Sequence, residues 1–286
     1  MTDSATHLSE STAAVAPDTV FADILCAVDG TRGSFAAVEQ AASLAGPSGH
    51  LTLLAVTAVA GGGAFRQAAL GDSRAELILD RAADMAYNAG VGATKVVDPA
   101  EPAVQVILER ATQHDLLAIG APVTSWLGGM FIGGVAAQTL GEFTTPLLAA
   151  RALPTEHRFA ERILVASDGL QDPEQVVELA GRLASTRSAE LILLHAIGVE
   201  SNARPHRIEA QLHRLEETVG GPVQARIAAA DARELILAST AGNGGPPLLV
   251  MGSRRLEGLR AIGSVSRRVV HEARCSVLLV PPADAG

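Results

Sequence analysis

The chain has few aromatic residues and few cysteines. Only 3% of its 286 residues are aromatic although 48% are hydrophobic, so small and aliphatic side chains supply most of the apolar surface. This composition suits helices packed on buried strands. The two cysteines, Cys26 and Cys275, lie far apart and beside apolar runs. They exclude a disulfide framework, and we expect two buried thiols in a reducing, cytoplasmic compartment.

Positive charge is also scarce. The chain carries 22 basic and 31 acidic residues, a net charge of −9. Repulsion by phosphates disfavours a nucleic-acid partner, and the balance favours a soluble protein with a small ligand. The first twenty residues have neither a basic start nor a continuous apolar run, so they do not predict a signal peptide.

No charged residue occurs between Asp115 and Glu142. Six glycines and Pro122 interrupt this stretch, so it predicts strand, loop and helix rather than a membrane span. We therefore expect no membrane partner.

The chain contains two copies of one unit. The segment DILCAVDGTRGSFAAVEQAASLA resembles RILVASDGLQDPEQVVELAGRLA, which makes Asp29 equivalent to Asp168. Further along, LTLLAVTA matches LILLHAIG, LLAIG matches LLVMG, and TTPLLAA matches CSVLLVP. The predicted organisation is a disordered tail at 1–20, a first domain at 21–151, a linker at 152–160 and a second domain at 161–283.

Each copy alternates short apolar runs with amphipathic segments of helix length. This order predicts two tandem doubly wound α/β domains, each with a five-stranded parallel sheet. In the first copy the expected strands are at about 23–28, 51–57, 93–97, 116–119 and 146–150. The expected helices are at about 33–45, 73–89, 101–113 and 134–143. The second copy repeats the order, with PVQARIAA as its third strand.

In such sheets a ligand binds beyond the carboxyl ends of the strands, where the strand order changes direction. The candidate residues of the second copy therefore follow its apolar runs: Asp168, Gly169, His195, Ala196, Gly252, Ser253, Arg254, Arg255, Gly263, Ser264, Val265 and Ser266. Glycines let backbone N–H groups approach a phosphate, a helix start adds a positive dipole end, and serine and arginine add donors. The pattern favours an anion such as a polyphosphate. Simple capping of the helix by Gly-Ser is the alternative.

Several candidates have a structural alternative as well. Asp29 and Asp168 could accept from a ribose hydroxyl or an amino group, help to hold a cation, or cap the following turn. His195 ends an apolar run, and a packed histidine is the favoured interpretation. The sequence has no His/Cys cluster with metal-ligand spacing. We expect Arg267, Arg268 and Arg274 to lie on a solvated helix face.

The doubled strand-Asp-Gly openings, LLHAI and MGSRRLEGLRAIGSVSRRVVHEARCSVLLVPP resemble the universal stress protein family in its tandem form. The resemblance covers about 23–282. It implies five-stranded parallel domains related to the adenine nucleotide alpha hydrolase fold. The ATP-binding branch carries the pattern Gly, two residues, Gly, nine residues, then Gly and Ser or Thr.

Both copies depart from that pattern. In the second copy Gly252 and the ending Gly263-Ser264-Val265-Ser266 match, but Arg255 replaces the middle glycine, Gly258 lies nearby, and the loop is two residues shorter. The first copy keeps the full spacing from Gly120 to Gly133, but has Val123 and Gly134 at the other positions and no basic residue over 116–150. By resemblance the adenosine-side positions are Asp29 and Gly30 with Val56, and Asp168 with Ala196.

The resemblance implies a cytoplasmic stress-response sensor or regulator that binds an adenine nucleotide, ATP with or without Mg²⁺. A homodimeric scaffold that binds a protein partner and no nucleotide is the alternative. An ATP-hydrolysing enzyme is disfavoured, because the chain has neither a Ser-Gly-Gly pyrophosphate loop nor a His-x-Gly-His motif. We expect the second copy to be the better nucleotide site. The last strands of the two copies should pair antiparallel within one chain.

Overall fold

The computed structural model describes residues 19–57, 72–100, 102–121, 135–154, 157–167, 173–197, 205–241, 245–253 and 265–282. The predicted tail over 1–20 lies almost wholly outside them.

The strands of the first half follow the predicted order closely. They are β1 (Asp23–Ala27), β2 (His50–Val56), β3 (Gly92–Asp98), β4 (Leu116–Gly120) and β5 (Leu147–Ala150). The helices are α1 (Arg32–Ala45), α2 (Asp72–Asn88), α3 (Ala103–Ala111) and α4 (Val135–Glu142). The helix expected over 101–113 is shorter because Pro102, with an extended backbone, precedes its first turn.

The second half repeats these elements. Its strands are β6 (Arg162–Ser167), β7 (Glu190–Ala196), β8 (Gln224–Ala228), β9 (Leu248–Gly252) and β10 (Val277–Val280). Its helices are α5 (Pro173–Arg187), α6 (Pro205–Val219), α7 (Ala232–Thr240) and α9 (Val265–Glu272).

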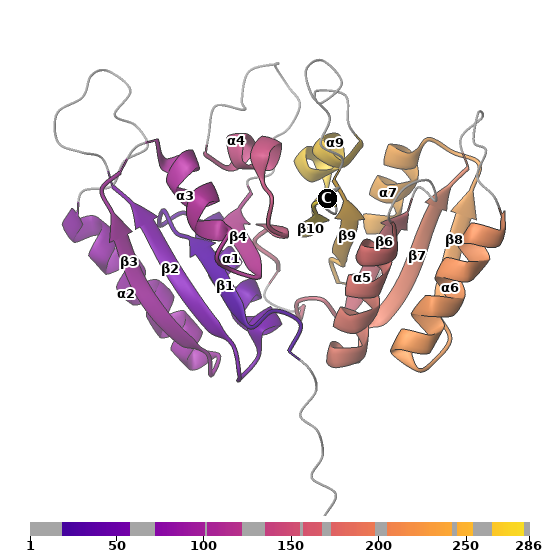
Figure 1. Ribbon diagram of the computed structural model, residues 1–286, viewed down its shortest axis with the longest axis horizontal. Coiled ribbons are helices and arrows are strands. Elements are labelled where there is room, and N and C mark those ends of the chain that lie inside the picture. The colour runs from indigo at the N-terminus through magenta and orange to yellow at the C-terminus, as the bar shows by residue number, and fades with distance from the viewer. Residues whose placement is uncertain are drawn as a thin grey trace, which may run out of the picture.

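All these strands belong to one ten-stranded sheet in the order β3-β2-β1-β4-β5-β10-β9-β6-β7-β8. Figure 1 shows the two halves side by side, with β10 near the middle. Within each half the neighbouring strands are parallel, and the strand order changes direction between the first and fourth strands. The prediction of two doubly wound, five-stranded parallel units is therefore confirmed.

The two halves meet through an antiparallel pair of strands, β5 and β10, as the sequence predicted. Leu148 lies opposite Leu278, and Leu147 lies opposite Leu279. Since β4 pairs Leu117 with Leu147 and β9 pairs Leu249 with Val277, Leu147 and Val277 are equivalent. The alignment of TTPLLAA with CSVLLVP was therefore wrong by one residue, because both strands contain Leu-Leu.

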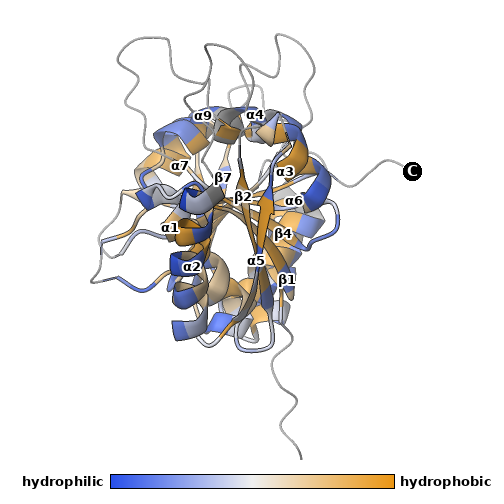
Figure 2. Cartoon of the chain, turned by 90° about the vertical axis from the view of Figure 1, so that its left-hand side faces the viewer, coloured by the Kyte–Doolittle hydropathy of each residue, from blue (hydrophilic) through white to orange (hydrophobic). Residues whose placement is uncertain are grey.

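Helices cover both faces of the sheet. One core cluster contains residues of α1, α2, α5 and α6, and the other contains residues of α3, α7 and α9. Figure 2 shows hydrophobic residues concentrated on the strands and hydrophilic residues on the outer helix surfaces. Strands buried on both faces explain the nearly continuous apolar runs of the sequence.

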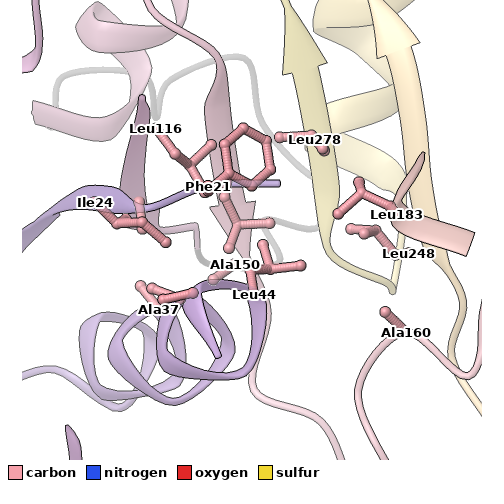
Figure 3. Close-up of a cluster of buried hydrophobic side chains, with 14 of the residues drawn as sticks. Phe21, Ile24, Ala37, Leu44, Leu116, Ala150, Ala160, Leu183, Leu248 and Leu278 are labelled. Carbon is pink, nitrogen blue, oxygen red and sulfur yellow. The ribbon is translucent and has the colours of Figure 1, made fainter. Parts of the chain in front are cut away.

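The core is continuous between the halves. Figure 3 shows Leu44 of α1 and Leu183 of α5 within one cluster that also contains Leu248 and Leu278. The two thiols, Cys26 and Cys275, are free and buried, as predicted.

Candidate functional site

The start of α1 follows β1 through a short turn that Asp29 organises. Its Oδ1 accepts hydrogen bonds from the backbone N–H of Thr31 at 2.9 Å and from the Thr31 hydroxyl at 2.7 Å. The Thr31 hydroxyl in turn accepts from Ser34 N at 3.2 Å and caps α1. The capping interpretation of Asp29 is therefore confirmed. The side chain remains exposed, and among the described residues nothing donates to its Oδ2.

Gly30 is required by the backbone of this turn. Its φ is +82°, a left-handed conformation that glycine adopts without strain. A Cβ at this position would lie 2.6 Å from Ile78 Cδ1. Gly30 therefore lets the turn pack closely on α2.

The end of β4 touches the start of α1 backbone to backbone. A Cβ on Gly120 would lie 2.4 Å from both Gly33 C and Ser34 N, so no other residue fits there without a shift. Asp29 and Gly120 thus contact the same first turn of α1, one on each side of the point where the strand order changes direction. The sequence assigned Gly120 to a phosphate loop, and the structure adds this packing role.

The end of β2 places Val56 beside Asp98 of β3. Asp98 Oδ2 accepts from Arg110 Nε at 3.0 Å and from Arg110 Nη2 at 2.6 Å. These bonds hold the pKa of Asp98 below its ordinary value. The sequence analysis missed this ion pair. Its only signal was an acidic residue at a strand end and an arginine late in the following helix.

In the second half, polar groups lie under the ends of β6 and β7. Ser167 Oγ donates to Gln211 Oε1 of α6 at 2.8 Å, and His195 Nδ1 donates to the backbone carbonyl of Ser167 at 3.0 Å. Only 1% of His195 is exposed, so the prediction of a packed histidine is confirmed. Ala196 follows as a half-buried residue. The first half has Val28 and Ala55 where the second has Ser167 and His195.

The helix expected at the second anion site begins at Val265, as the sequence predicted. Val265 is partly exposed and Ser266 is buried. At the end of β9, Gly252 is exposed, and Ser253 N donates to Val280 O at 2.8 Å. Arg268 is exposed on α9, as predicted. Arg274 is also exposed but lies beyond the end of α9 at Glu272, so its placement on a helix face was wrong, and the side chain of Arg267 is not described.

The remaining predicted site residues lie outside the described part of the chain. They are Asp168, Gly169, Arg254, Arg255, Gly258, Gly263 and Ser264 in the second half, and Gly133 and Gly134 in the first.

Two further properties concern the described ranges only. They contain no group of three or more His, Cys, Asp or Glu residues that could hold a metal ion. Their helices are also too short or too polar to cross a membrane.

Comparisons with known proteins agree with this fold. The sequence model of the universal stress protein family matches residues 21–151 and again residues 160–281. A universal stress protein from Archaeoglobus fulgidus DSM 4304 superimposes with a TM-score of 0.72 and 20% identity over 94% of this chain and 98% of its own. A functionally unknown protein from Pseudomonas aeruginosa PAO1 superimposes with a TM-score of 0.65 and 20% identity over 92% of this chain and 94% of its own. No curated protein matches the sequence. Because the two family matches cover most of the sequence, the chain belongs to the universal stress protein family.

Proposed function

We propose that this universal stress protein binds an adenine nucleotide, ATP, and acts as a cytoplasmic stress-response sensor or regulator. One observation carries the proposal. The exposed carboxylate of Asp29 and the backbone of Gly120 meet the same helix start, at the point where the strand order changes direction. That point is where open α/β sheets bind nucleotides.

The two ends of the nucleotide would contact different residues. Asp29 retains an oxygen for a ribose hydroxyl or the base amino group, and the end of β2 at Val56 would lie beside the base. The phosphates would bind backbone N–H groups near Gly120, Gly133 and Gly134.

In the second half Asp168, Gly169 and Ala196 would bind the adenosine. Gly252, Gly258 and Gly263 to Ser266, with Ser253, Arg254 and Arg255, would take the phosphates. Mg²⁺ would bind through the phosphates, since it prefers to keep waters and substrate oxygens as ligands.

The proposed role is binding and regulation rather than dedicated catalysis. The scaffold alternative has one observation in its favour: Asp29 is already engaged as a turn cap, which needs no ligand. Under that alternative the apolar sheet would serve only to hold two halves together for a protein partner.

The experiment that separates the two begins with protein purified without added nucleotide. Denaturation and mass spectrometry of the extract should recover ATP, ADP or another adenine compound. Calorimetric titration with ATP should give micromolar binding, which Asp168→Ala weakens if the second half binds the nucleotide and Asp29→Ala weakens if the first half does. The matched control is Glu39→Ala, an exposed carboxylate further along α1. No adenine compound and no heat of binding would contradict the proposal.

A further inference from the structure

The sheet ends in two outer strands, β3 in the first half and β8 in the second. The pairing of β3 with β2 repeats the pairing of β8 with β7, so the two edges correspond residue by residue. This register makes Lys95 of β3 equivalent to Ala225 of β8, and Asp98 equivalent to Ala228. The edges therefore differ at two positions where the first half is charged.

The edge at β3 carries charges that oppose the addition of another strand. Lys95 Nζ donates to Asp80 Oδ1 of α2, and Asp98 accepts from Arg110. Charged residues on an edge strand, lysine above all, protect a sheet from edge-to-edge pairing. The edge at β8 has alanines at the equivalent positions, so it lacks both of these charges.

The backbone of β8 is free on its outer side. Ile197 N donates to Ala228 O at 2.8 Å, so the backbone polar groups of Ala228 face β7. Because these groups alternate between the two sides of a strand, the N–H and C=O groups of Ala225 and Ile227 face outward. Within the described ranges no hydrogen bond satisfies them, and Ile227 is 49% exposed. Two donors and two acceptors are therefore available to a further strand.

A hollow of about 400 Å³ lies beside the turn that leads into β8. It is lined by residues of α6 and of this turn: His213, Glu216, Glu217, Gly221 and Pro222. The opposite flank of α6 faces α5, because a Cβ on Gly181 would lie 3.0 Å from Thr218 Cγ2. The hollow therefore opens on the outer side of α6, next to the free edge.

The charge around this edge favours a basic occupant. Glu216 and Glu217 line the hollow. Gln224 Nε2 donates to Glu190 Oε1 at 3.1 Å, which adds a third carboxylate at the start of β8. The single charged residue of β8, Arg226, lies by strand alternation on the other sheet face, toward α7. A basic side chain on the α6 face would therefore meet carboxylates rather than Arg226.

A second copy of the chain suits this edge less well. If the outward groups of Ala225 and Ile227 all bonded across a twofold axis, Arg226 would lie directly opposite its own copy. Like charges in that position destabilise a strand pair. The edge therefore favours a segment of a different protein over self-pairing.

We propose that β8 binds an extended, basic segment of a protein partner as an eleventh strand of the sheet. Backbone hydrogen bonds to Ala225 and Ile227 supply affinity, and side chains on the α6 face supply selectivity. Positions four residues apart lie on the same face of a strand, about 13 Å from each other. The segment therefore carries an apolar side chain against Ile227 and, four residues away, a lysine or arginine at the hollow. This surface does not depend on nucleotide binding.

The probe is a fluorescent eight-residue peptide of threonines with valine at its second position and lysine at its sixth. Fluorescence anisotropy with the full chain should show saturable binding. Replacing the lysine by glutamate should weaken binding by roughly tenfold or more, because a carboxylate would then face Glu216 and Glu217. N-methylation of alternate amides, at even positions in one peptide and odd positions in another, should abolish binding of only one of them, because a single backbone edge pairs with β8.

Variants of the chain test the same edge. Ala225→Lys gives β8 the residue that β3 has at the equivalent position, and it should abolish binding. Ile227→Pro removes an outward N–H without removing a bond to β7, so it should also weaken binding. Glu216→Gln should weaken binding of the lysine peptide. The matched control is Glu178→Gln, which changes an exposed carboxylate on α5 and should leave binding unchanged.

Urea unfolding first establishes which variants are folded. Equal binding of both N-methylated peptides would overturn the proposal, as would undiminished binding by folded Ala225→Lys or Ile227→Pro. The absence of saturable binding to the lysine peptide would overturn it too. Equal losses in Glu216→Gln and Glu178→Gln would reduce the selectivity to net charge and contradict the role of the hollow. A doubled chain mass that Ala225→Lys abolishes, without peptide binding, would assign the edge to a second copy instead.

Discussion

The backbone N–H of Arg151 donates to the hydroxyl of Ser276 at 2.9 Å, across the junction of the two halves. Ser276 Oγ donates to Gln40 Oε1 at 2.7 Å, and Gln40 Nε2 donates to the Arg151 carbonyl at 2.6 Å. These three residues close a buried ring of hydrogen bonds beside β5 and β10. The Arg151 guanidinium also donates to the carbonyls of Ala121 and Val270. The halves are therefore joined by specific polar contacts as well as by apolar strands.

Removing the Ser276 hydroxyl should destabilise the whole chain. Ser276→Ala leaves Gln40 and the Arg151 N–H without their buried partner, which should lower the free energy of unfolding by about 1–3 kcal/mol. The measurement is urea unfolding followed by circular dichroism. Thr186→Ala is the matched control, because its hydroxyl bonds only within α5 at the surface. Equal small losses for both variants would contradict a role for the ring in stability.

The Asp98–Arg110 ion pair should make the free energy of unfolding depend on pH in the acidic range. Arg110 lowers the pKa of Asp98 in the folded chain, so the stabilisation is present above the unfolded pKa of Asp98. It is lost as the pH falls through the lower folded pKa. Because Arg110 is partly exposed, the contribution should be below about 1 kcal/mol. Unfolding experiments between pH 7 and pH 3 should show a smaller loss for Asp98→Asn than for the parent. A parallel decline in both proteins would rule out this contribution.

Neither thiol should react while the chain is folded. Burial raises the pKa of Cys275 to about 12 and raises that of Cys26 further, so neither forms a thiolate near neutral pH. A disulfide reagent such as DTNB at pH 8 should label no thiol in the native protein and two in urea. Fast labelling of the native protein would show that one of these strands opens readily.

The sequence predicted the architecture because its signals are local and repeated. Apolar runs separated by amphipathic segments indicate parallel strands, and doubling of the Asp-Gly opening indicates two units. The alignment of β5 with β10 was wrong by one residue, because Leu-Leu pairs align equally well one residue apart. The start of α9 was found because Gly-Ser-Val-Ser is a helix-start pattern.

The site was only partly predictable, because its contacts join distant residues. The close approach of Gly120 to Gly33 depends on how β4 lies against α1, which no local pattern encodes. The same holds for Asp98 with Arg110 and for Arg151 with Ser276. For His195 the sequence indicated burial, but its hydrogen bond to the Ser167 carbonyl depends on how β7 lies beside β6.

The chain should form a homodimer in solution. Closed twofold symmetry is the commonest arrangement of oligomers, and tandem relatives of this kind are expected to pair. Light scattering at micromolar concentration should give twice the chain mass of 29.3 kDa. A mass equal to one chain would contradict the dimer without affecting the fold.

The second half should be the better nucleotide site. It has Ser264 and Ser266 at a helix start and Arg254 and Arg255 in the preceding loop, so hydroxyls and guanidinium groups are available to a triphosphate. The first half offers Gly133 and Gly134, with no basic residue over 116–150. Against this ordering, the second loop is two residues shorter than the family pattern. We expect charge and hydroxyl donors to outweigh loop length.

Calorimetric titration of single variants decides between the halves. The parent should bind about one ATP tightly per chain; Asp168→Ala should abolish that site, Ser264→Ala should weaken it, and Asp29→Ala should leave it nearly unchanged. ATP at about 1,000 times its Kd should raise the free energy of unfolding by roughly 4 kcal/mol, and the melting temperature by several degrees. The Asp168→Ala variant should lose this shift. The Asp29→Ala variant should keep it when its melting temperatures with and without ATP are compared, although removing the Asp29 cap lowers both of them. The reverse pattern would show that the first half is the working site, because its full-length loop matters more than the arginines of the second.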